Sequence, residues 1–373
     1  MADIVNMKVV GVGGAGNNVV GRMIMNGIDG VTYCCINTDR AALGKVSGAE
    51  RLQIGDKLTR GQGAGSKPQV GRMAAEEDRA AIDKLFEGTD MVFITAGMGG
   101  GTGTGAAPVV AEAARAAGAL TIGVVTMPFK WEGSRKMRVA EAGVEELLKQ
   151  VDTLFVIPNE NLRKVTEMKV SLAEAFQISD EVLQRTVVGL SRILSTTGFI
   201  NLDFADVRHT LRGSGLAHLG VAEASGKSKV EEAAAAVMRS ELTDTGVHGA
   251  RRIIINVSAA PDVDMDDVSA VMDRIQEAVH PDANIIFGCD FDEHLSDALR
   301  VIFIATDFAE DDGSDAAAEA QTARSAREPV REPVREARPA RRESAPAEPK
   351  RNSAGDTSEQ EWDVIWDSFF KKN

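Results

Sequence analysis

The sequence predicts an α/β protein: a doubly wound, Rossmann-like parallel sheet comes first, and a smaller α/β domain follows a long central helix. Short apolar runs alternate with helical patterns from residue 7 to about residue 160, as in repeated βα units. Two glycine-rich segments each follow an apolar run and lead into a helix. Large apolar residues nearly vanish between residues 309 and 359. We therefore expect a first domain at 1–170, the central helix and the loop after it at 171–212, a second domain at 213–308, a disordered linker at 309–359 and a terminal peptide at 360–373.

The first glycine-rich segment lies between a predicted strand, Met7–Val10, and a helix predicted from Val19 to Asn26. Its glycines at positions 11, 13 and 16 match the pattern G-x-G-x-x-G, and Asp39 follows the next predicted strand about twenty residues later. Taken alone, this half of the chain predicts a nicotinamide-dependent oxidoreductase as well as it predicts any other nucleotide-binding protein.

The second segment runs from Ala96 to Ala107 and holds six glycines and two threonines. It lies between a predicted buried strand, Asp90–Thr95, and an Ala-rich helix predicted to begin at Pro108. Backbone N–H groups in such a loop approach a ligand closely, the helix dipole favours negative charge, and threonine hydroxyls add donors. No lysine follows the last glycine, so this is not a Walker A loop, and the backbone would hold most of a phosphate. The close flanking by strand and helix argues against a merely flexible loop.

Two glycine-rich segments about ninety residues apart favour a triphosphate, since a dinucleotide fold needs one such loop for its pyrophosphate. The sequence downstream shows no convincing catalytic arrangement of Cys, His or Tyr with Lys. The five histidines are scattered along the second half of the chain, at His209, His218, His248, His280 and His294.

The composition limits the size of the core and the kinds of partner that we expect. A chain of 373 residues with 43% hydrophobic content can build two domains with real cores. Its net charge of −14 argues against binding nucleic acid by bulk electrostatics. The three cysteines have no metal-ligand spacing, which fits a reducing cytoplasm. The sequence shows no signal peptide and no apolar run of membrane-spanning length, so we expect no direct insertion into a membrane.

The run GGGTGTG at Gly99–Gly105 resembles the tubulin signature, and with its flanks the chain is identified as a member of the FtsZ family, the bacterial tubulin homologues. The family's first loop is usually GVGGGGNN, and Ala15 replaces one glycine here. The resemblance implies a GTPase that binds GTP or GDP, with Mg²⁺ held through the phosphates rather than by fixed side chains. It also implies head-to-tail homopolymers that form the cytoplasmic division ring at mid-cell. A filament-forming tubulin relative that is not used in division is the alternative.

Several candidate site residues share one edge of the predicted sheet, because ligands collect at the carboxyl ends of parallel strands. A carboxylate such as Asp180 can accept both N1–H and the N2 amino group of guanine, a donor pair that adenine lacks. Glu132 can bind ribose hydroxyls, and Lys136 lies one helical turn further on, where the family usually has Arg; Arg135 is the alternative. The resemblance implies that the nucleotide contacts are Gly14, Ala15, Gly16, Asn17, Asn18, Gly101, Thr102, Gly103, Glu132, Lys136, Asn159, Phe176 and Asp180.

Two carboxylates, Asp203 and Asp206, follow the predicted long helix Ser171–Ser195. Sequence alone favours helix capping for them, whereas the resemblance to the family's catalytic loop N-x-D-F-x-D implies that they are catalytic. A helix of about 25 residues is nearly 40 Å long. The two aspartates would therefore act on the nucleotide of a neighbouring molecule.

The second domain shows no site chemistry, and its predicted strands Asn284–Gly288 and Arg300–Ile304 are candidates to pair. The terminal peptide places apolar side chains on one helical face, which is typical of a docking peptide. The family's chains also end in a linker and a partner-binding peptide, so we expect membrane-adaptor and regulatory division proteins as partners. The family's usual Pro-containing motif is absent here. The apolar face consists of Trp362, Ile365, Trp366, Phe369 and Phe370.

Overall fold

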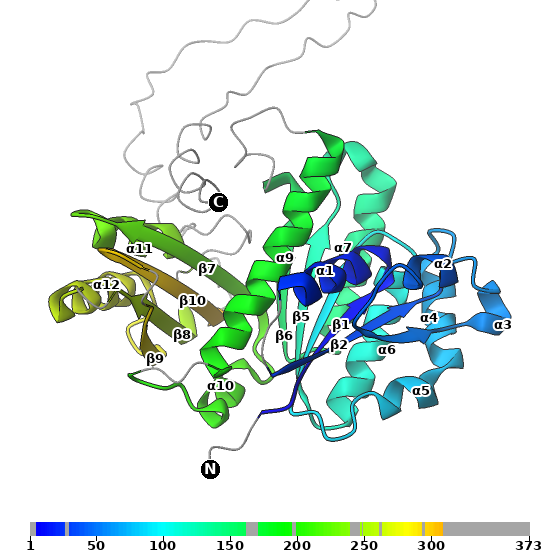
Figure 1. Ribbon diagram of the computed structural model, residues 1–373, viewed down its shortest axis with the longest axis horizontal. Coiled ribbons are helices and arrows are strands. Elements are labelled where there is room, and N and C mark those ends of the chain that lie inside the picture. The colour runs from blue at the N-terminus through cyan, green and yellow to red at the C-terminus, as the bar shows by residue number, and fades with distance from the viewer. Residues whose placement is uncertain are drawn as a thin grey trace, which may run out of the picture. The chain divides into compact units, whose positions relative to one another are not determined.

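The computed structural model describes residues 5–26, 30–161, 171–195, 199–238, 247, 249–260, 263–292 and 295–308 (Figure 1). The predicted linker and terminal peptide, 309–373, lie outside these residues. Within them, the predicted fold class is confirmed: a Rossmann-like parallel sheet, a long central helix and a smaller α/β domain.

Six parallel strands form the first sheet in the order β3-β2-β1-β4-β5-β6. Because the chain moves outward from β1 in both directions, the carboxyl ends of β1 and β4 meet at the point where the strand order reverses. The bounds are β1 Met7–Val12, β2 Val31–Asn37, β3 Glu50–Gln53, β4 Met91–Gly97, β5 Leu120–Met127 and β6 Thr153–Pro158.

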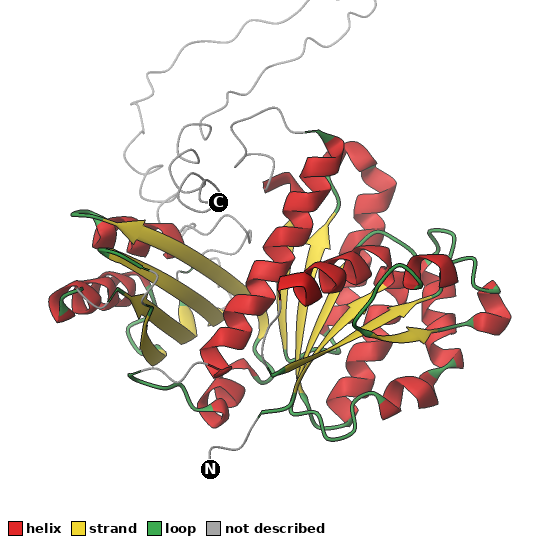
Figure 2. Ribbon diagram, in the orientation of Figure 1, coloured by secondary structure: helices red, strands yellow, loops and turns green. Residues whose placement is uncertain are grey.

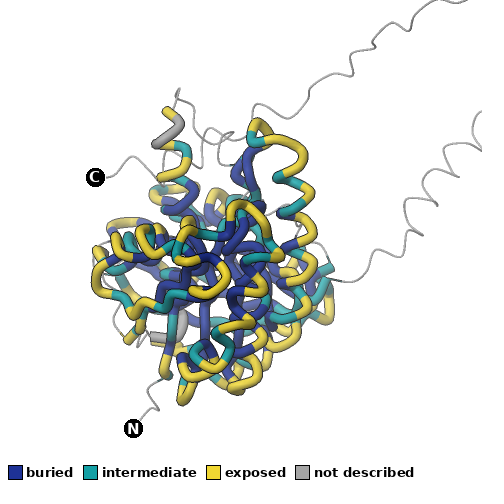
Figure 3. Tube along the Cα trace, turned by 90° about the vertical axis from the view of Figure 1, so that its right-hand side faces the viewer, coloured by how far each residue is buried: buried dark blue, intermediate teal, exposed yellow. Residues whose placement is uncertain are grey.

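Helices cover both faces of this sheet (Figure 2). Alternate residues of β1 show the division: Val9 packs with α1 and α9, whereas Val10 packs with α6 on the other side. Both faces of the strands are thus buried, which explains their nearly continuous apolar sequences. Figure 3 shows the buried positions gathered inside and the exposed ones on the outer helix faces. The helices are α1 Gly13–Asn26, α4 Pro68–Glu77, α5 Arg79–Lys84, α6 Thr102–Ala116, α7 Ser134–Leu148 and α9 Leu172–Ser195.

Two helices begin earlier than predicted. Helix α1 begins at Gly13 rather than Val19, and α6 begins at Thr102, which leaves Pro108 inside the helix. The prediction treated the glycine-rich segments as loops, but their last residues form the first helical turns. Pro at the first helical position is only a preference, and here Pro108 is not in the first turn.

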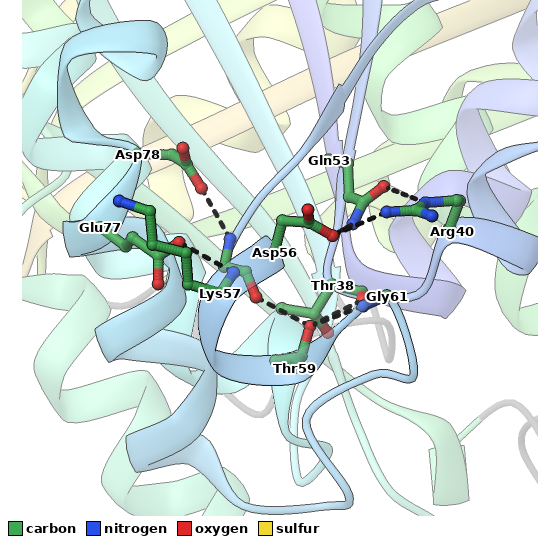
Figure 4. Close-up of polar contacts among 10 residues, drawn as sticks. Thr38, Arg40, Gln53, Asp56, Lys57, Thr59, Gly61, Glu77 and Asp78 are labelled. Carbon is green, nitrogen blue, oxygen red and sulfur yellow. Dashed lines mark hydrogen bonds and ion pairs between the residues drawn. The ribbon is translucent and has the colours of Figure 1, made fainter.

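The sequence of Gln69–Phe86, with its mixed charged face, predicts one helix, but the structure has two. The chain breaks at Asp78 between α4 and α5, and Asp78 Oδ2 accepts a hydrogen bond from Gly55 N at 2.7 Å (Figure 4). Short elements in this region were not predicted, since four residues carry no periodicity. They are α2 Arg40–Leu43, β3 and α3 Asp56–Thr59.

The second domain holds four strands in the order β7-β10-β8-β9, and a short parallel pairing of β7 with β6 joins them to the first sheet. The predicted pairing of 284–288 with 300–304 is wrong: β9 pairs in parallel with β8, and β10 lies antiparallel between β7 and β8. Strand β10 is the more apolar, and it occupies the central position. The elements are β7 Gly215–Ser225, α11 Lys229–Met238, β8 Ala250–Ala259, α12 Met265–Ala278, β9 Asn284–Phe291 and β10 Ala298–Phe308.

The long helix α9 is continuous, as predicted, and a reciprocal capping box starts it. Ser171 N donates to Glu174 Oε2 at 2.6 Å, and Glu174 N donates to Ser171 Oγ at 3.3 Å. Helix α10, Phe204–Leu211, then lies against the amino ends of the first sheet's strands. Thr153 Oγ1, at the start of β6, donates to Leu211 O at 2.6 Å. Arg208 Nη2 donates to Gly118 O, just before β5, at 2.7 Å.

Among the described residues, no helix combines the length and the apolar character needed to cross a bilayer.

Candidate nucleotide site

A cavity of about 290 Å³ opens at the carboxyl ends of β1, β4, β5 and β6, against the first half of α9. Ten of the thirteen predicted nucleotide contacts line it: Gly14, Ala15, Gly101, Thr102, Gly103, Glu132, Lys136, Asn159, Phe176 and Asp180. The sequence interpretation did not single out the other lining residues, which are Val12, Gly97, Met98, Gly100, Thr126, Pro128 and Ser179. Most of these end a strand or follow one, so their position at the sheet edge was the available signal.

The two glycine loops, far apart in sequence, touch each other in the structure. Gly13 has φ 75°, and a Cβ there would lie 2.7 Å from Gly103 N. A Cβ on Gly97 would lie 2.8 Å from the Cβ of Ala15. Ala15 itself lies in α1 and is not among the residues with positive φ, so the exchange of Gly for Ala introduces no backbone strain.

Two glycines in the cavity lining have open space, not packed atoms, where a side chain would lie. A Cβ on Gly14 or on Gly100 would meet nothing within 4 Å, and both residues line the cavity. A ligand can therefore approach the backbone directly at these two positions.

The N-terminus of α6 supplies the donors for an anion. Its first intrahelical bond runs from Gly105 N to Gly101 O at 3.1 Å, so the N–H groups of Thr102 and Gly103 precede the hydrogen-bonded turns. These groups and the helix dipole favour a negative ligand at this end of the cavity. Backbone binding of phosphate fits this arrangement.

The threonine hydroxyls also hold the loop together. Thr104 Oγ1 accepts a hydrogen bond from Gly99 N at 2.9 Å, and Thr102 Oγ1 lies 2.6 Å from Thr38 Oγ1. Thr38 is in turn tied to Thr59, whose Oγ1 donates to Thr38 O at 3.3 Å (Figure 4). Thr102 lines the cavity and Thr104 does not, so of the two only Thr102 fits the predicted role as a phosphate donor.

The polar contacts in Figure 4 fasten the segment beside Thr38. Arg40 Nη2 donates to Asp56 Oδ1 at 2.7 Å, and Lys57 N donates to Glu77 Oε1 at 3.1 Å. Asp39, the acidic residue of the dinucleotide pattern, caps α2 by accepting a hydrogen bond from Ala42 N. Asp39 is not among the residues that line the cavity, where the dinucleotide pattern would require a ribose contact.

Three predicted contacts, Gly16, Asn17 and Asn18, do not line the cavity. Asn17 is buried, and its Nδ2 donates to Gly11 O at 2.8 Å. Asn37, which was not predicted, donates from Nδ2 to Asn17 Oδ1 at 2.7 Å. The Asn17 side chain thus fixes the first glycine loop within the apoprotein, and its contact with a nucleotide stays a prediction, as do those of Gly16 and Asn18.

Glu132 and Lys136 form an ion pair in the cavity lining. Lys136 Nζ donates to Glu132 Oε2, and Phe129 N donates to Glu132 Oε1 at 2.9 Å. Lys136 lines the cavity, whereas Arg135 is exposed and does not. Of these two cations, only Lys136 is placed to contact a ligand in the cavity, and its role in place of the family's usual Arg stays a prediction.

Helix α9 contributes an aromatic ring and a carboxylate. Phe176 is 41% exposed and meets Phe129 and Trp131 edge-on, with ring centroids 5.7 and 6.2 Å away. Asp180 is buried, and burial raises its pKa from 3.8 to about 6, although the Arg22 guanidinium, 3.5 Å away, opposes the rise.

Asn159 completes this end of the cavity. Ser179 Oγ donates to Asn159 Oδ1 at 2.7 Å, and both residues are buried. The bond turns the Asn159 amide oxygen toward Ser179, which leaves its NH₂ group as the donor available to a ligand.

The predicted catalytic pair, Asp203 and Asp206, does not line the cavity. Asp203 caps α10 by accepting a hydrogen bond from Ala205 N at 3.2 Å, and Asp206 is exposed in the first turn. Helix α10 contacts the amino ends of the strands, the edge opposite the cavity. From Asp180 to the end of α9 is 15 residues, or about 22 Å. This is shorter than the length expected from the whole helix, but it still keeps both aspartates away from the cavity of their own chain.

The fold and the site define a GTPase domain of the tubulin type. Residues 6–167 match the model of the Tubulin/FtsZ family GTPase domain, and residues 215–309 match the model of the FtsZ family C-terminal domain. FtsZ from M. jannaschii, in a structure described as an empty dimer, is 41% identical with a TM-score of 0.76, over 81% of this chain and 88% of that chain. The chain belongs to the FtsZ family, as its sequence motifs predicted.

A more distant structural match shows the fold alone. CetZ2 from Haloferax volcanii, described as a GTPγS-bound protofilament, is 22% identical with a TM-score of 0.68. The match covers 86% of this chain and 100% of that chain.

Proposed function

We propose that this protein binds GTP in the cavity, hydrolyses it and polymerises head to tail into filaments. The observation that carries the proposal is the meeting of both glycine loops, Asn159 and Asp180 around one cavity in a chain of the FtsZ family. In this arrangement the α6 N-terminus and the glycine loops hold the phosphates, and Glu132 binds the ribose. Phe176 stacks on the base, and Asp180 and Asn159 read its edge.

The cavity fits a guanine nucleotide in its donors and charges. Backbone N–H groups meet the phosphate end, and carboxylates stand at the nucleoside end, in Glu132 and Asp180. Mg²⁺ is proposed to bind through the nucleotide phosphates, where it would neutralise charge.

Hydrolysis is proposed to need a second copy of the chain. Asp203 and Asp206 of one molecule would approach the cavity of the next and orient the attacking water. Opposite edges of the sheet carry the two half-sites, which is the arrangement that a head-to-tail contact requires.

An exposed apolar cluster near α10 supports such a contact. Phe199 and Phe291 are 78% and 54% exposed, with ring centroids 5.9 Å apart. Ile200 joins them through paired backbone bonds with Cys289 at 3.0 Å. Large apolar groups gathered on a surface commonly mark a protein contact, and M. jannaschii FtsZ has been described as a dimer.

The proposed cellular role is the cytokinetic ring at the bacterial division site, in the cytoplasm at mid-cell. The terminal peptide would bind membrane-adaptor and regulatory division proteins. Depletion that leaves septation unchanged would instead favour a filament-forming relative without a role in division.

Light scattering with GTP, GDP and ATP in Mg²⁺ buffer tests the biochemical proposal. We expect assembly with GTP alone, and disassembly as it is consumed. A competition assay against NAD serves as the control, because NAD binding without GTP binding would establish the oxidoreductase alternative.

A further inference from the structure

Asp180 has a cationic partner outside the cavity lining. Arg22 lies on α1, the helix that carries the first glycine loop, and its Nε is 3.5 Å from Asp180 Oδ2. The Arg22 side chain is 32% exposed and that of Asp180 13%, so water screens this pair only in part. Arg22 is not among the residues that line the cavity.

Few charges face Asp180 among the described residues. Burial raises the pKa of Asp180 most, Arg22 lowers it, and the neighbouring Glu181 raises it. Glu132 and Lys136 line the same cavity and pair with each other. Strand β5, which packs against α9, adds the neutral Thr126 to the cavity.

The protonation state of this carboxyl decides which base it accepts. An ionised carboxylate offers two acceptors to the N1–H and N2 amino donors of guanine. A protonated carboxyl carries a donor, which opposes guanine N1–H but matches the N1 acceptor of adenine. Anything that keeps Asp180 ionised therefore favours guanine over adenine.

We propose that Arg22 is a positioning residue that holds Asp180 ionised and aimed at the base, and so sets the preference for guanine. The inference rests on the proposed binding of GTP in this cavity. In this role Arg22, on α1, affects the base only through Asp180, which lies on α9.

Arg22→Gln tests the role by its pH profile. Relative to wild type, we expect GTP affinity to fall by about three- to tenfold at pH 6.5 and by less than about twofold at pH 8.5, because deprotonation at high pH restores the carboxylate without Arg22. The ratio of GTP to ATP affinity should narrow at pH 6.5. Arg22→Lys, which keeps the charge, should restore most of the wild-type profile. Displacement of a fluorescent GDP analogue from full-length protein measures each value.

Arg79→Gln is the matched control. Arg79 is equally exposed at 32% but pairs with Asp83 and Glu112 away from the cavity. We expect it to bind GTP like wild type. In an Asp180→Asn background, Arg22→Gln should have no further effect on the pH profile, since nothing remains to titrate.

The outcomes separate this inference from the proposed function. Wild-type protein that does not bind GTP would refute the proposed function itself. GTP binding that is weakened by Asp180→Ala but keeps the wild-type pH profile in Arg22→Gln would overturn the inference alone. A loss that is equal at all pH values, and equal in Arg22→Lys, would make Arg22 a packing residue and overturn it as well.

Discussion

At the scale of single residues, Asp180 shows a conflict between stability and recognition. Its pKa rises from 3.8 to about 6 on folding, chiefly through burial. A carboxyl with a raised pKa stabilises the folded state below its unfolded value, and this contribution is lost as the pH rises through the folded value. At neutral pH the apoprotein therefore holds a buried charge that weakens it, and this same charge is the proposed reader of guanine.

Asp180→Asn should therefore stabilise the nucleotide-free protein. The shift corresponds to about 3 kcal/mol at pH 7.5, and to about half of that at pH 5. Thermal unfolding of both proteins without nucleotide measures the difference. An Asn variant less stable than wild type at pH 7.5 would show that the carboxylate is satisfied in the apoprotein.

Removal of the Asp180 side chain should weaken GTP binding. Asp180→Ala leaves the N1 and N2 donors of a buried guanine unpaired, which costs about 1–3 kcal/mol, or roughly five- to 150-fold in Kd. Isothermal titration with GTP measures this. The affinity for ATP should change little. An equal loss of affinity for GTP and ATP would contradict the recognition of guanine by Asp180.

At the scale of elements, predictions succeeded where one local signal decides the structure. The apolar runs Leu120–Thr126 and Val151–Ile157 each predict a strand, and helical period with a capping box at Ser171 predicts the long helix. The structure has all three, with strands at Leu120–Met127 and Thr153–Pro158. The strand ends then brought eight of the thirteen predicted contacts to one edge of the sheet, and α9 added Phe176 and Asp180. Helix starts in the glycine loops and the pairing of β9 failed, because contacts from distant segments decide both.

The crossing of α4 and α6 explains why the signature has a glycine at position 105, which phosphate binding alone does not explain. A Cβ on Gly105 would lie 1.9 Å from Pro68 O, a backbone atom that cannot move aside. Gly105 of the signature therefore serves the packing of α6 against the start of α4, besides the proposed binding of phosphate by the loop. A Cβ on Gly101 would likewise lie 2.9 Å from Lys67 N, just before α4.

Gly105→Ala should lower the free energy of unfolding by about 1–3 kcal/mol, since overpacking outweighs the gain in helix propensity. Gly21→Ala is the control. Gly21 is also inside a helix, but its nearest neighbour to an added Cβ is 4.0 Å away, so this change should stabilise by about 0.5–1 kcal/mol. Thermal unfolding compares the two, and a stabilised Gly105→Ala would show that the crossing adapts easily.

At the scale of the whole molecule, the terminal peptide is expected to act separately from the globular domains. Deletion of residues 362–373 should leave GTP hydrolysis and assembly largely intact while abolishing adaptor binding, because a linker of about fifty residues intervenes. Pull-down with a membrane adaptor and a phosphate-release assay measure the two effects. Loss of GTP binding on truncation would mean that the peptide folds back onto the core.

The placement of the cavity and of α10 at opposite edges of the sheet predicts that catalysis is shared between molecules. The cavity lies at the carboxyl edge of the sheet, and α10 with Asp203 and Asp206 contacts the amino edge. Asp206→Ala should then bind GTP normally but hydrolyse it poorly. Wild-type activity per molecule should rise steeply with protein concentration and vanish on dilution, as phosphate release will measure.

Mixing two defective variants separates a shared site from one within a single chain. Asp206→Ala keeps a cavity that binds GTP, whereas Asp180→Ala keeps both aspartates but has a weakened cavity that stays empty at low GTP. In an equal mixture, about half of the Asp206→Ala cavities face an Asp180→Ala neighbour, because each head-to-tail contact joins one cavity to one α10. The mixture should therefore hydrolyse GTP at about a quarter of the wild-type rate at the same total protein, whereas each variant alone, as the control, should hydrolyse little. A mixture no more active than the two variants measured separately, or a wild-type rate that persists at nanomolar protein, would place catalysis within one chain.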